Sequence, residues 1–335
     1  MYISLADLSH KKELIDLWAE TFGDGEKFIS SFLDAYMIPE YNVPVIIENA
    51  KIASVLYLID FPLYSNRNNL GDCAYLFAAA TKKEHRNKGC MSQLISYSAE
   101  LCKNRGLKAI FLFPQDQDKK LFDFYSKFGF KTIYAAKKIK TQTPAISNKV
   151  RKSAPFQKGA VESGFRLVDQ DITNAEIFDG LYNSYAEFTA KQELAPMKDR
   201  LFYFKCASSY LENPDARFAV FEKIHGKPAE NTHNVDKFCY VFYKKYKNTY
   251  YIDDIIHSKY ADLLADFLLN SPDHGVNLEI NLLLPATATP ATATPLIFSD
   301  SQTVPLAMLL PLSGEVCYIT ENLKSPVYIN MFMNI

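Results

Sequence analysis

Residues 76–95, LFAAATKKEHRNKGCMSQLI, contain the pattern that decides the fold of the first part of the chain. The run 76–80 is apolar and made of mostly small residues, which is typical of a buried strand. A polar turn follows and leads into an apolar-periodic helix that begins near Gly89. The first backbone N–H groups of a helix have no partner within the helix, and the helix dipole favours negative charge there. The stretch therefore predicts a site for an anion such as phosphate.

The turn taken alone leaves a second interpretation open, because a single glycine after a polar turn also begins many ordinary helices. Gly89 would allow a positive φ or a close approach of the backbone to a phosphate. Arg86 and Lys88 add positive charge beside it. The stretch lacks GxxxxGK[ST] and GxGxxG, so it is neither a P-loop nor a dinucleotide fingerprint.

Two motifs, in a fixed order, resemble the signatures of the GNAT superfamily of N-acetyltransferases. The turn is similar to the family's acyl-CoA motif R/Q-x-x-G-x-G/A: Arg86 and Gly89 match it, while Met91 is larger than the usual small residue, as in one tandem-domain branch. The run LFDFYSKFGF at 121–130 is similar to the family's helix carrying FY-x-K-x-GF, and a predicted strand at 109–113 lies between the two motifs. The resemblance covers residues 1–140.

The resemblance implies a mixed α/β acyl-CoA N-acyltransferase fold, with acetyl-CoA as co-substrate and a primary amine as acceptor. It implies direct attack of the amine on the thioester, without a covalent enzyme intermediate and without a metal. Pantetheine is expected along the end of the strand before the turn, and pyrophosphate on the N–H groups of the turn. The alternative is a tightly packed strand and a solvated basic turn. The implied cofactor-binding residues are Ala79, Ala80, Thr81, Arg86, Asn87, Lys88, Gly89, Cys90, Met91 and Ser92.

The family's usual general acid is a tyrosine in the second motif, and Tyr125 occupies that position. Its hydroxyl would protonate the departing thiolate. The alternative is a core aromatic residue, since Phe122, Phe124 and Phe128 surround it in sequence.

The general base is not identified by the sequence. Glu84 and His85 lie too near the expected phosphates, and Asp253 and Asp254 qualify only if the second half faces the acceptor. Resemblance to tandem acetyltransferases of the enhanced-intracellular-survival type suggests the terminal carboxylate of Ile335, although this tail differs from theirs. Water-mediated deprotonation would need no dedicated residue.

Composition places limits on the class of protein. A chain of 335 residues with 48% hydrophobic residues can bury large cores and favours two domains. The net charge of −1 gives no general attraction to nucleic acid or anionic membranes. Six cysteines are scattered without CxxC spacing, so a zinc site is not expected, and Cys90 is interpreted mainly as a loop residue. No signal segment or apolar run of membrane-spanning length is found, which favours a cytoplasmic protein. Oligomerisation is left open.

The predicted domains are an acetyltransferase domain at 1–140, a polar linker at 141–163 and a degenerate GNAT-like domain at 164–335 that shapes the acceptor site. The second half repeats the order of elements but has HSKYAD at 257–262 in place of the glycine turn, so we expect no coenzyme A there. The proline-rich run 285–295 is expected to be a loop. First-half strands are expected at 2–5, 43–48, 52–61, 70–80, 109–113 and 131–138, and helices at 10–22, 26–36, 89–105 and 119–128. Second-half strands are expected at 165–168, 217–222, 238–244, 250–257 and 276–284, helices at 174–191, 198–211 and 260–269, and strand-like sequence at 318–319 and 327–333.

Two rival functions remain at this point. An acyl-CoA-binding pseudoenzyme or sensor would bind coenzyme A without turnover. An aminoacyl transferase that uses charged tRNA would need a basic groove, and the near-neutral charge weighs against it.

Overall fold

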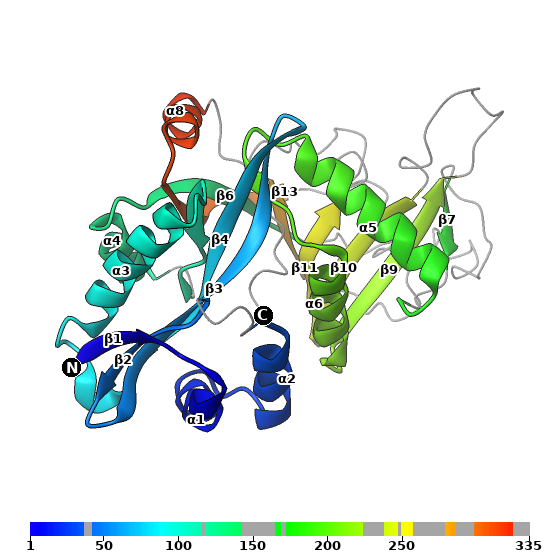
Figure 1. Cartoon of the computed structure of the whole chain (residues 1–335). Helices are drawn as coiled ribbons and strands as arrows, with labels where there is room; N and C mark the ends of the chain where they lie inside the picture. Colours follow the sequence, from blue (N-terminus) through cyan, green and yellow to red (C-terminus); the bar gives the residue numbers. More distant parts are fainter. Residues whose placement is uncertain are drawn as a thin grey trace. The chain divides into compact units, whose positions relative to one another are not determined.

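The computed structural model describes residues 1–36, 42–115, 118–142, 165–168, 172–223, 238–246, 249–256, 279–285 and 298–323. The chain forms two compact units (Figure 1). Unit 1 contains Met1–Leu63, Asn69–Ile133 and Ala307–Asn322, and unit 2 contains Tyr64–Asn68, Tyr134–Leu306 and Leu323–Ile335. A segment near the C-terminus thus belongs to the first unit, whereas the sequence had placed it in a second domain.

The sheet of unit 1 has the strand order β1-β2-β3-β4-β5-β13. Neighbouring strands β4 and β5 are parallel, whereas the pairs β1/β2, β2/β3 and β5/β13 are antiparallel. The hairpin between β2 and β3 turns at Asn49 and Ala50, which both have positive φ, as a two-residue turn of type I′ requires. The strands are β1 (Tyr2–Leu5), β2 (Pro44–Glu48), β3 (Lys51–Ser65), β4 (Asn68–Thr81), β5 (Ala109–Leu112) and β13 (Phe298–Pro311).

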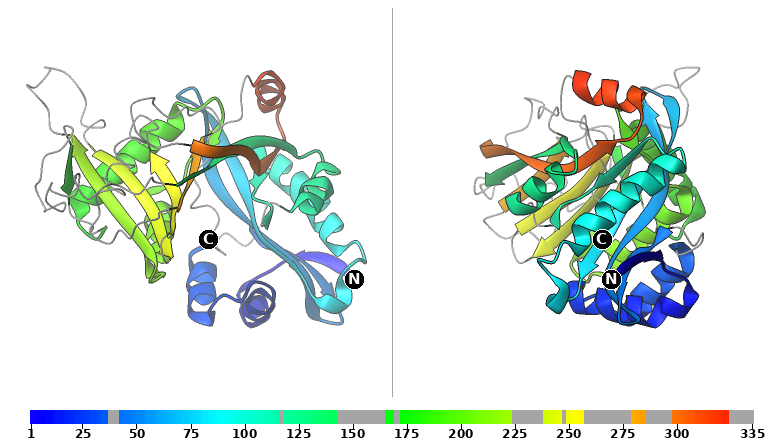
Figure 2. Two further views of the ribbon diagram at one scale, coloured as in Figure 1. Left: turned by 180° about the vertical axis from the view of Figure 1, so that it is seen from behind. Right: turned by 60° about the vertical axis from the view of Figure 1, so that its left-hand side comes forward.

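Side chains from alternate positions of β4 enter two different cores. Ala74 and Leu76 pack with residues of α3 (Cys90–Asn104) and α4 (Lys119–Ser126). Figure 2 shows α3 alongside the strands of this unit. The intervening Phe77 packs edge-on against Trp18, with the ring centroids 5.4 Å apart. The period of two along β4 therefore separates the two faces of the sheet.

The aromatic core on the second face is centred on Trp18, which is 1% exposed. Trp18 lies on α1 (Lys11–Phe22), which packs against α2 (Glu26–Tyr36). Its indole N–H donates to Asp24 (2.7 Å), so the buried ring has a polar partner. Rings within 6.5 Å of it belong to Phe22, Phe28, Phe32, Tyr57 and Phe77.

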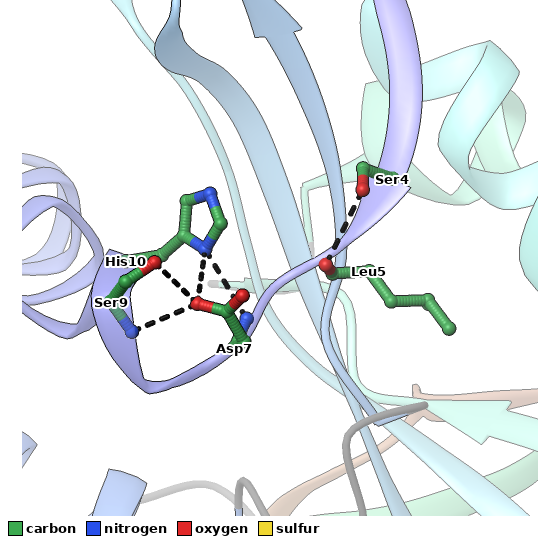
Figure 3. A network of polar contacts seen from close by, with 5 residues as sticks. All are labelled: Ser4, Leu5, Asp7, Ser9 and His10. Atoms are coloured by element: carbon green, nitrogen blue, oxygen red, sulfur yellow. Dashed lines mark hydrogen bonds and ion pairs between the residues drawn. The ribbon is translucent and has the colours of Figure 1, made fainter.

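The connection from β1 to α1 is fixed by a small polar network (Figure 3). Oδ1 of Asp7 accepts from the backbone N–H of Ser9 at 2.8 Å and lies 2.9 Å from Nδ1 of His10. Asp7 caps the short 3₁₀ helix Leu8–His10, which runs directly into α1. The Ser9 hydroxyl is the main cause that lowers the pKa of Asp7. Ser4, at the end of β1, bonds the carbonyl of Leu5.

Unit 2 has the strand order β6-β12-β11-β10-β9-β7, with β11 and β12 parallel and the pairs β12/β6, β11/β10, β10/β9 and β9/β7 antiparallel. In the described parts of both units, a parallel pair lies one strand in from one end of the stated order: β11/β12 next to β6, and β4/β5 next to β13. Helix α5 packs on β10 and β11, and α6 packs on β9. The elements are β6 (Lys131–Gln142), β7 (Phe165–Val168), α5 (Ala175–Ala190), β8 (Ala195–Pro196), α6 (Arg200–Glu212), β9 (Ala216–Lys223), β10 (Phe238–Tyr246), β11 (Thr249–Ile256) and β12 (Glu279–Pro285).

The fold class predicted from the sequence, a mixed α/β sheet, is confirmed. Two details near the C-terminus differ. The strand-like sequence predicted at 318–319 lies in a helix, α8 (Gly314–Asn322), whose buried Val316 and Thr320 are one helical turn apart. Strand β13 was not predicted. The expected helix at 260–269, the strand at 327–333, residues 286–295 of the proline-rich loop and nearly all of the linker lie outside the described residues.

Within the described ranges, the structure has no helix of the length and apolarity needed to cross a bilayer.

Candidate active site

The site begins where β4 and β5 part. The two parallel strands are paired only at Ala74 with Ile110 and at Tyr75 with Phe111. Strand β5 ends at Leu112, whereas β4 continues to Thr81. Within the part of the chain that the structure describes, the last residues of β4 therefore have no strand partner on the β5 side.

A backbone irregularity in β4 coincides with this separation. Ala78 has a φ of +45°, a conformation that a residue with a Cβ adopts rarely and that is typical of strained or functional positions. Beyond it, Ala79 packs against the core beneath α3, which is the face that Ala74 and Leu76 also contact. The alternation of faces is thus shifted by one residue at Ala78, as in a β-bulge.

Three hydrogen bonds hold the end of β4 against β3. Ser54, which is fully buried, donates its hydroxyl proton to the carbonyl of Ala80 at 3.0 Å. The Thr81 hydroxyl lies 2.7 Å from that of Ser54 and, since the Ser54 proton is already used, it is the donor to Ser54. The backbone N–H of Lys82 continues the pairing by donating to Ala53 at 3.0 Å. These bonds occupy the β3 side of the strand and leave its β5 side open.

In the turn between β4 and α3, Gly89 has the positive φ that was one of the two options left open by the sequence. The turn contains a 3₁₀ turn, Lys83–His85, and then Asn87 and Gly89, both with positive φ (61° and 80°). The Cβ of a residue replacing Gly89 would contact only the Gln93 side chain, at 4.0 Å. The glycine is therefore needed for its backbone angle and not because space is lacking.

The first turn of α3 has N–H groups that are free of helical partners. The first bond of the helix runs from the N–H of Gln93 to the carbonyl of Gly89 at 3.0 Å. The N–H groups of Cys90, Met91 and Ser92 precede it and have no carbonyl within the helix to bond. Together with the dipole, they form a place where an oxyanion is stabilised.

Four predicted residues lie on the solvent side of this turn: Arg86, Asn87, Lys88 and Gly89 are all exposed. Nε of Arg86 donates to the carbonyl of Thr81 at 3.1 Å, so the guanidinium is folded back over the end of β4. Together with Lys88, it gives the mouth of the turn a positive charge.

The other predicted residues, Cys90, Met91 and Ser92, form the first turn of α3. The Cys90 thiol is buried beside the carbonyl of His85 (3.7 Å) and Met1 Sδ (3.9 Å), and the Met91 side chain packs against the core. Ser92 lines an open depression of about 510 Å³ beside Ile3. Cys90 begins the helix and is not a loop residue.

Tyr125 lies in the core beneath α3 and α4 with 8% of its surface exposed. Phe124 and Phe130 contact its ring, at centroid distances of 5.3 and 5.7 Å. Burial raises the pKa of Tyr125 to about 12, so its hydroxyl is protonated at neutral pH. Both sequence interpretations, an acid and a core aromatic residue, agree with this environment.

The candidate bases have different environments. Glu84 is exposed, and a hydrogen bond from its own backbone is the main cause that lowers its pKa. Nδ1 of His85 lies 3.2 Å from Oε2 of Glu48. In β11, Phe242 pairs with Asp254 and Tyr243 with Ile252, so Asp253 is the extra residue of a bulge. The residue Ile335 lies outside the described residues.

Sequence reasoning missed Glu48, Ser54 and Ala78. Glu48 is an ordinary acidic residue at a hairpin end, and the bulge at Ala78 has no glycine to mark it. Ser54 carried a usable signal, because its hydroxyl interrupts the apolar part of β3 at 52–59. Across the described ranges, no group of three or more His, Cys, Asp or Glu side chains is placed to hold a metal ion.

Comparison with known proteins concerns the family of the N-terminal region and the fold. Residues 3–133 match the family model described as an acetyltransferase (GNAT) domain. No curated protein has significant similarity to the chain. Among solved structures, a probable N-acyltransferase from Enterococcus faecalis V583 is similar with a TM-score of 0.66 and 12% identity, over 92% of this chain and 72% of that one.

Two further structures have the same degree of similarity. A GCN5-related N-acetyltransferase from Anabaena variabilis ATCC 29413 has a TM-score of 0.64 at 11% identity, over 93% of this chain and 73% of its own. Eis1 from Mycobacterium abscessus has a TM-score of 0.64 at 12% identity, over 94% of this chain and 75% of its own. At these identities the likeness concerns the fold. The match to the GNAT acetyltransferase domain is carried by the family model and concerns the N-terminal region, residues 3–133.

Proposed function

We propose that the chain is an acetyl-CoA-dependent N-acetyltransferase that moves an acetyl group to a primary amine by direct attack. The observation that carries this proposal is the end of β4, which among the described residues is open on its β5 side and lies next to a left-handed glycine turn and the first N–H groups of α3, which have no partner within the helix. An extended amide chain can pair with an open strand edge, and a pyrophosphate can bind at a helix N-terminus. Pantetheine and the phosphates of coenzyme A offer these two groups in one molecule.

Each residue then has a role that its position supports. The backbone from Ala79 to Thr81 pairs with the pantetheine amides, and the N–H groups of Cys90, Met91 and Ser92 bind phosphate oxygens. Arg86 and Lys88 add positive charge at the exposed mouth, and the backbone angles of Asn87 and Gly89 shape the turn. No step requires a metal.

In the proposed reaction, Tyr125 is the general acid that protonates the leaving thiolate. The acceptor nitrogen forms a bond to the acyl carbon, the carbon–sulfur bond breaks, and the sulfur leaves as a thiolate. Tyr125 gives its proton to that thiolate and regains one from solvent. The amine loses its proton to water or to a carboxylate, for which the C-terminal carboxylate of Ile335 is the proposed group.

Unit 2 is proposed to be a degenerate copy of the same fold that shapes the acceptor site. In the part of unit 2 that the structure describes, antiparallel strands, a parallel pair (β11/β12) and the helices α5 and α6 support a common origin with unit 1. In the proposed division, domains at 1–140 and 164–335 are joined by a linker at 141–163. Residues Ala307–Asn322 of the second proposed domain belong to the first compact unit. We further propose that the protein is cytoplasmic. The proposed acceptor is the amine of a small molecule or of a protein.

The decisive experiment is calorimetric titration of the purified chain with acetyl-CoA beside a Gly89→Asp variant. The aspartate places a negative charge at the mouth of the turn, and we expect binding to fall by at least 10-fold. Gly25→Asp adds the same charge at a position with open space and should bind as the wild type does.

The outcome separates the rival functions. Binding by the wild type followed by acetylation in an amine screen supports the enzyme. Binding without turnover of any amine indicates a sensor, and a folded wild type that does not bind acetyl-CoA contradicts the proposal.

A further inference from the structure

We infer that Glu48 and His85 form a positioning pair that holds the phosphate-binding turn in its competent shape. The inference rests on the proposed function, because it concerns the affinity of that turn for coenzyme A. Neither residue is assigned a contact with the cofactor or the acceptor. Their effect passes through the backbone between β4 and α3.

The pair joins the sheet to the middle of the turn. Glu48 is the last residue of β2, where it pairs with Lys51 at the hairpin end. His85 is the last residue of the 3₁₀ turn, and its Nδ1 lies 3.2 Å from Oε2 of Glu48. The side chains are only 14% and 29% exposed, for His85 and Glu48 respectively, so solvent screens the interaction less than it screens a surface ion pair.

His85 is the point where a tether can act on the helix start. Its N–H donates to the carbonyl of Lys82 at 2.9 Å, which closes the 3₁₀ turn. Its carbonyl lies 3.7 Å from the thiol of Cys90, the first residue of α3. A line of contacts therefore runs from Glu48 through His85 to the helix N-terminus.

The carboxylate of Glu48 lies close enough to pair with Nδ1 of His85. Nδ1 of His85 is buried and, among the described residues, has no aligned hydrogen bond. The Glu48 oxygen is within ion-pair distance but off the direction of the ring N–H. A charged acceptor such as this carboxylate stabilises a buried ring N–H more than a neutral one does.

The same 3₁₀ turn offers a matched control, an exposed ion pair between Lys83 and Glu20. Lys83, in the same 3₁₀ turn, forms an ion pair with Glu20 at 3.5 Å, but there the side chains are 72% and 51% exposed. Exposed pairs contribute little to stability. Glu20→Ala thus removes a carboxylate paired with the same turn without disturbing a buried group.

The experiment measures acetyl-CoA affinity by calorimetry in Glu48→Ala, His85→Ala, the double variant and Glu20→Ala. We expect the Kd to rise about 10-fold in each single variant at positions 48 and 85, with no further loss in the double variant, because the two residues act as one unit. Glu20→Ala should remain within twofold of the wild type. Glu48→Gln retains an acceptor oxygen and should restore the affinity to within threefold.

A second readout separates positioning from a general loss of stability. KM for acetyl-CoA should rise, while kcat and the KM of the amine remain unchanged, and thermal unfolding reports the folded fraction of each variant. If Glu48→Ala does not fold, Glu48→Gln and His85→Asn, whose amide can replace Nδ1–H, carry the test.

Three results would overturn the inference. Wild-type affinity in folded Glu48→Ala would refute it and leave the proposed function intact, as would additive losses in the double variant. Absence of acetyl-CoA binding by the wild type would refute the proposed function and the inference with it.

Discussion

The hydroxyl of Ser54 on β3 donates a hydrogen bond to the carbonyl of Ala80 on β4, with the oxygens 3.0 Å apart. The bond lies in the fully buried part of the sheet and reaches the strand just beyond the bulge at Ala78. It thus fixes the β3 side of β4 where the β5 side is unpaired. The open edge remains available because the other edge is firmly held.

Replacing Ser54 with alanine should lower the free energy of unfolding by about 1–2 kcal/mol, because the buried carbonyl of Ala80 loses its donor. Urea unfolding measures the loss. Ser126→Ala serves as the control, since that hydroxyl bonds a carbonyl one turn back within α4 and the loss should be smaller. Equal losses in the two variants would contradict the interpretation.

Replacing Gly89 with alanine should cost about 1 kcal/mol of stability, since a Cβ disfavours a φ of +80°. No steric overlap adds to it, because the nearest atom would be 4.0 Å away. Gly314→Ala, at the start of α8 with nothing within 4 Å, should be neutral or slightly stabilising. The comparison of urea midpoints checks both, and a neutral Gly89→Ala would show that the turn tolerates a Cβ.

Replacing Tyr125 with phenylalanine should lower kcat about 100-fold at unchanged acetyl-CoA affinity, if the hydroxyl is the general acid. Burial raises the pKa of Tyr125 to about 12, and an acid works only below its pKa. The wild-type rate should therefore show no decline caused by Tyr125 between pH 7 and 10. Tyr97→Phe on α3 is the control, and an alkaline decline below pH 10 that disappears in Tyr125→Phe would contradict the assignment.

Replacing Arg105 with alanine should reduce stability by about 1 kcal/mol at pH 7, because Arg105 forms an ion pair with the half-buried Asp60. Burial raises the pKa of Asp60 above 3.8, and Arg105 opposes that rise. A carboxyl with a raised pKa in the folded state stabilises the fold fully below its unfolded pKa, and this stability is lost as pH rises through the folded pKa.

Without Arg105, the pKa of Asp60 should climb further, so the loss should extend to higher pH. Urea midpoints from pH 3.5 to 7 test this, with Asp60→Asn/Arg105→Ala as the control that removes the titrating group. Parallel profiles for the wild type and Arg105→Ala would refute the linkage.

Replacing Met308 with alanine should destabilise unit 1 by about 2–5 kcal/mol, the usual cost of a cavity in a core. Met308 on β13 is fully buried, pairs with Leu112 of β5 and belongs to the core beneath α3. Tyr318→Ala on α8 removes a side chain that is 68% exposed and should change the free energy of unfolding by less than about 0.5 kcal/mol. A small effect at Met308 would contradict the assignment of its side chain to the core of unit 1.

The sequence alone determined the main helices and strands of the first 133 residues. Each has a hydrophobic periodicity of its own and is bounded by polar or glycine-containing turns. The amphipathic pattern of 26–36 gives α2, and the small apolar run before a polar turn gives the end of β4. The sequence allowed Gly89 either a positive φ or a close approach to a phosphate, and the structure shows the positive φ, which glycine adopts without strain.

Only the tertiary structure decided which distant segments complete the site. Nothing in the residues 298–311 identifies β5 as their partner, since strand pairing depends on which edge remains open after the rest of the sheet has formed. The helix at Gly314–Asn322 forms where Val316 finds a buried position, which overrides its strand-like composition. The contacts of Ser54 and Glu48 join residues 26 and 37 positions apart, and such contacts follow from packing and not from local sequence.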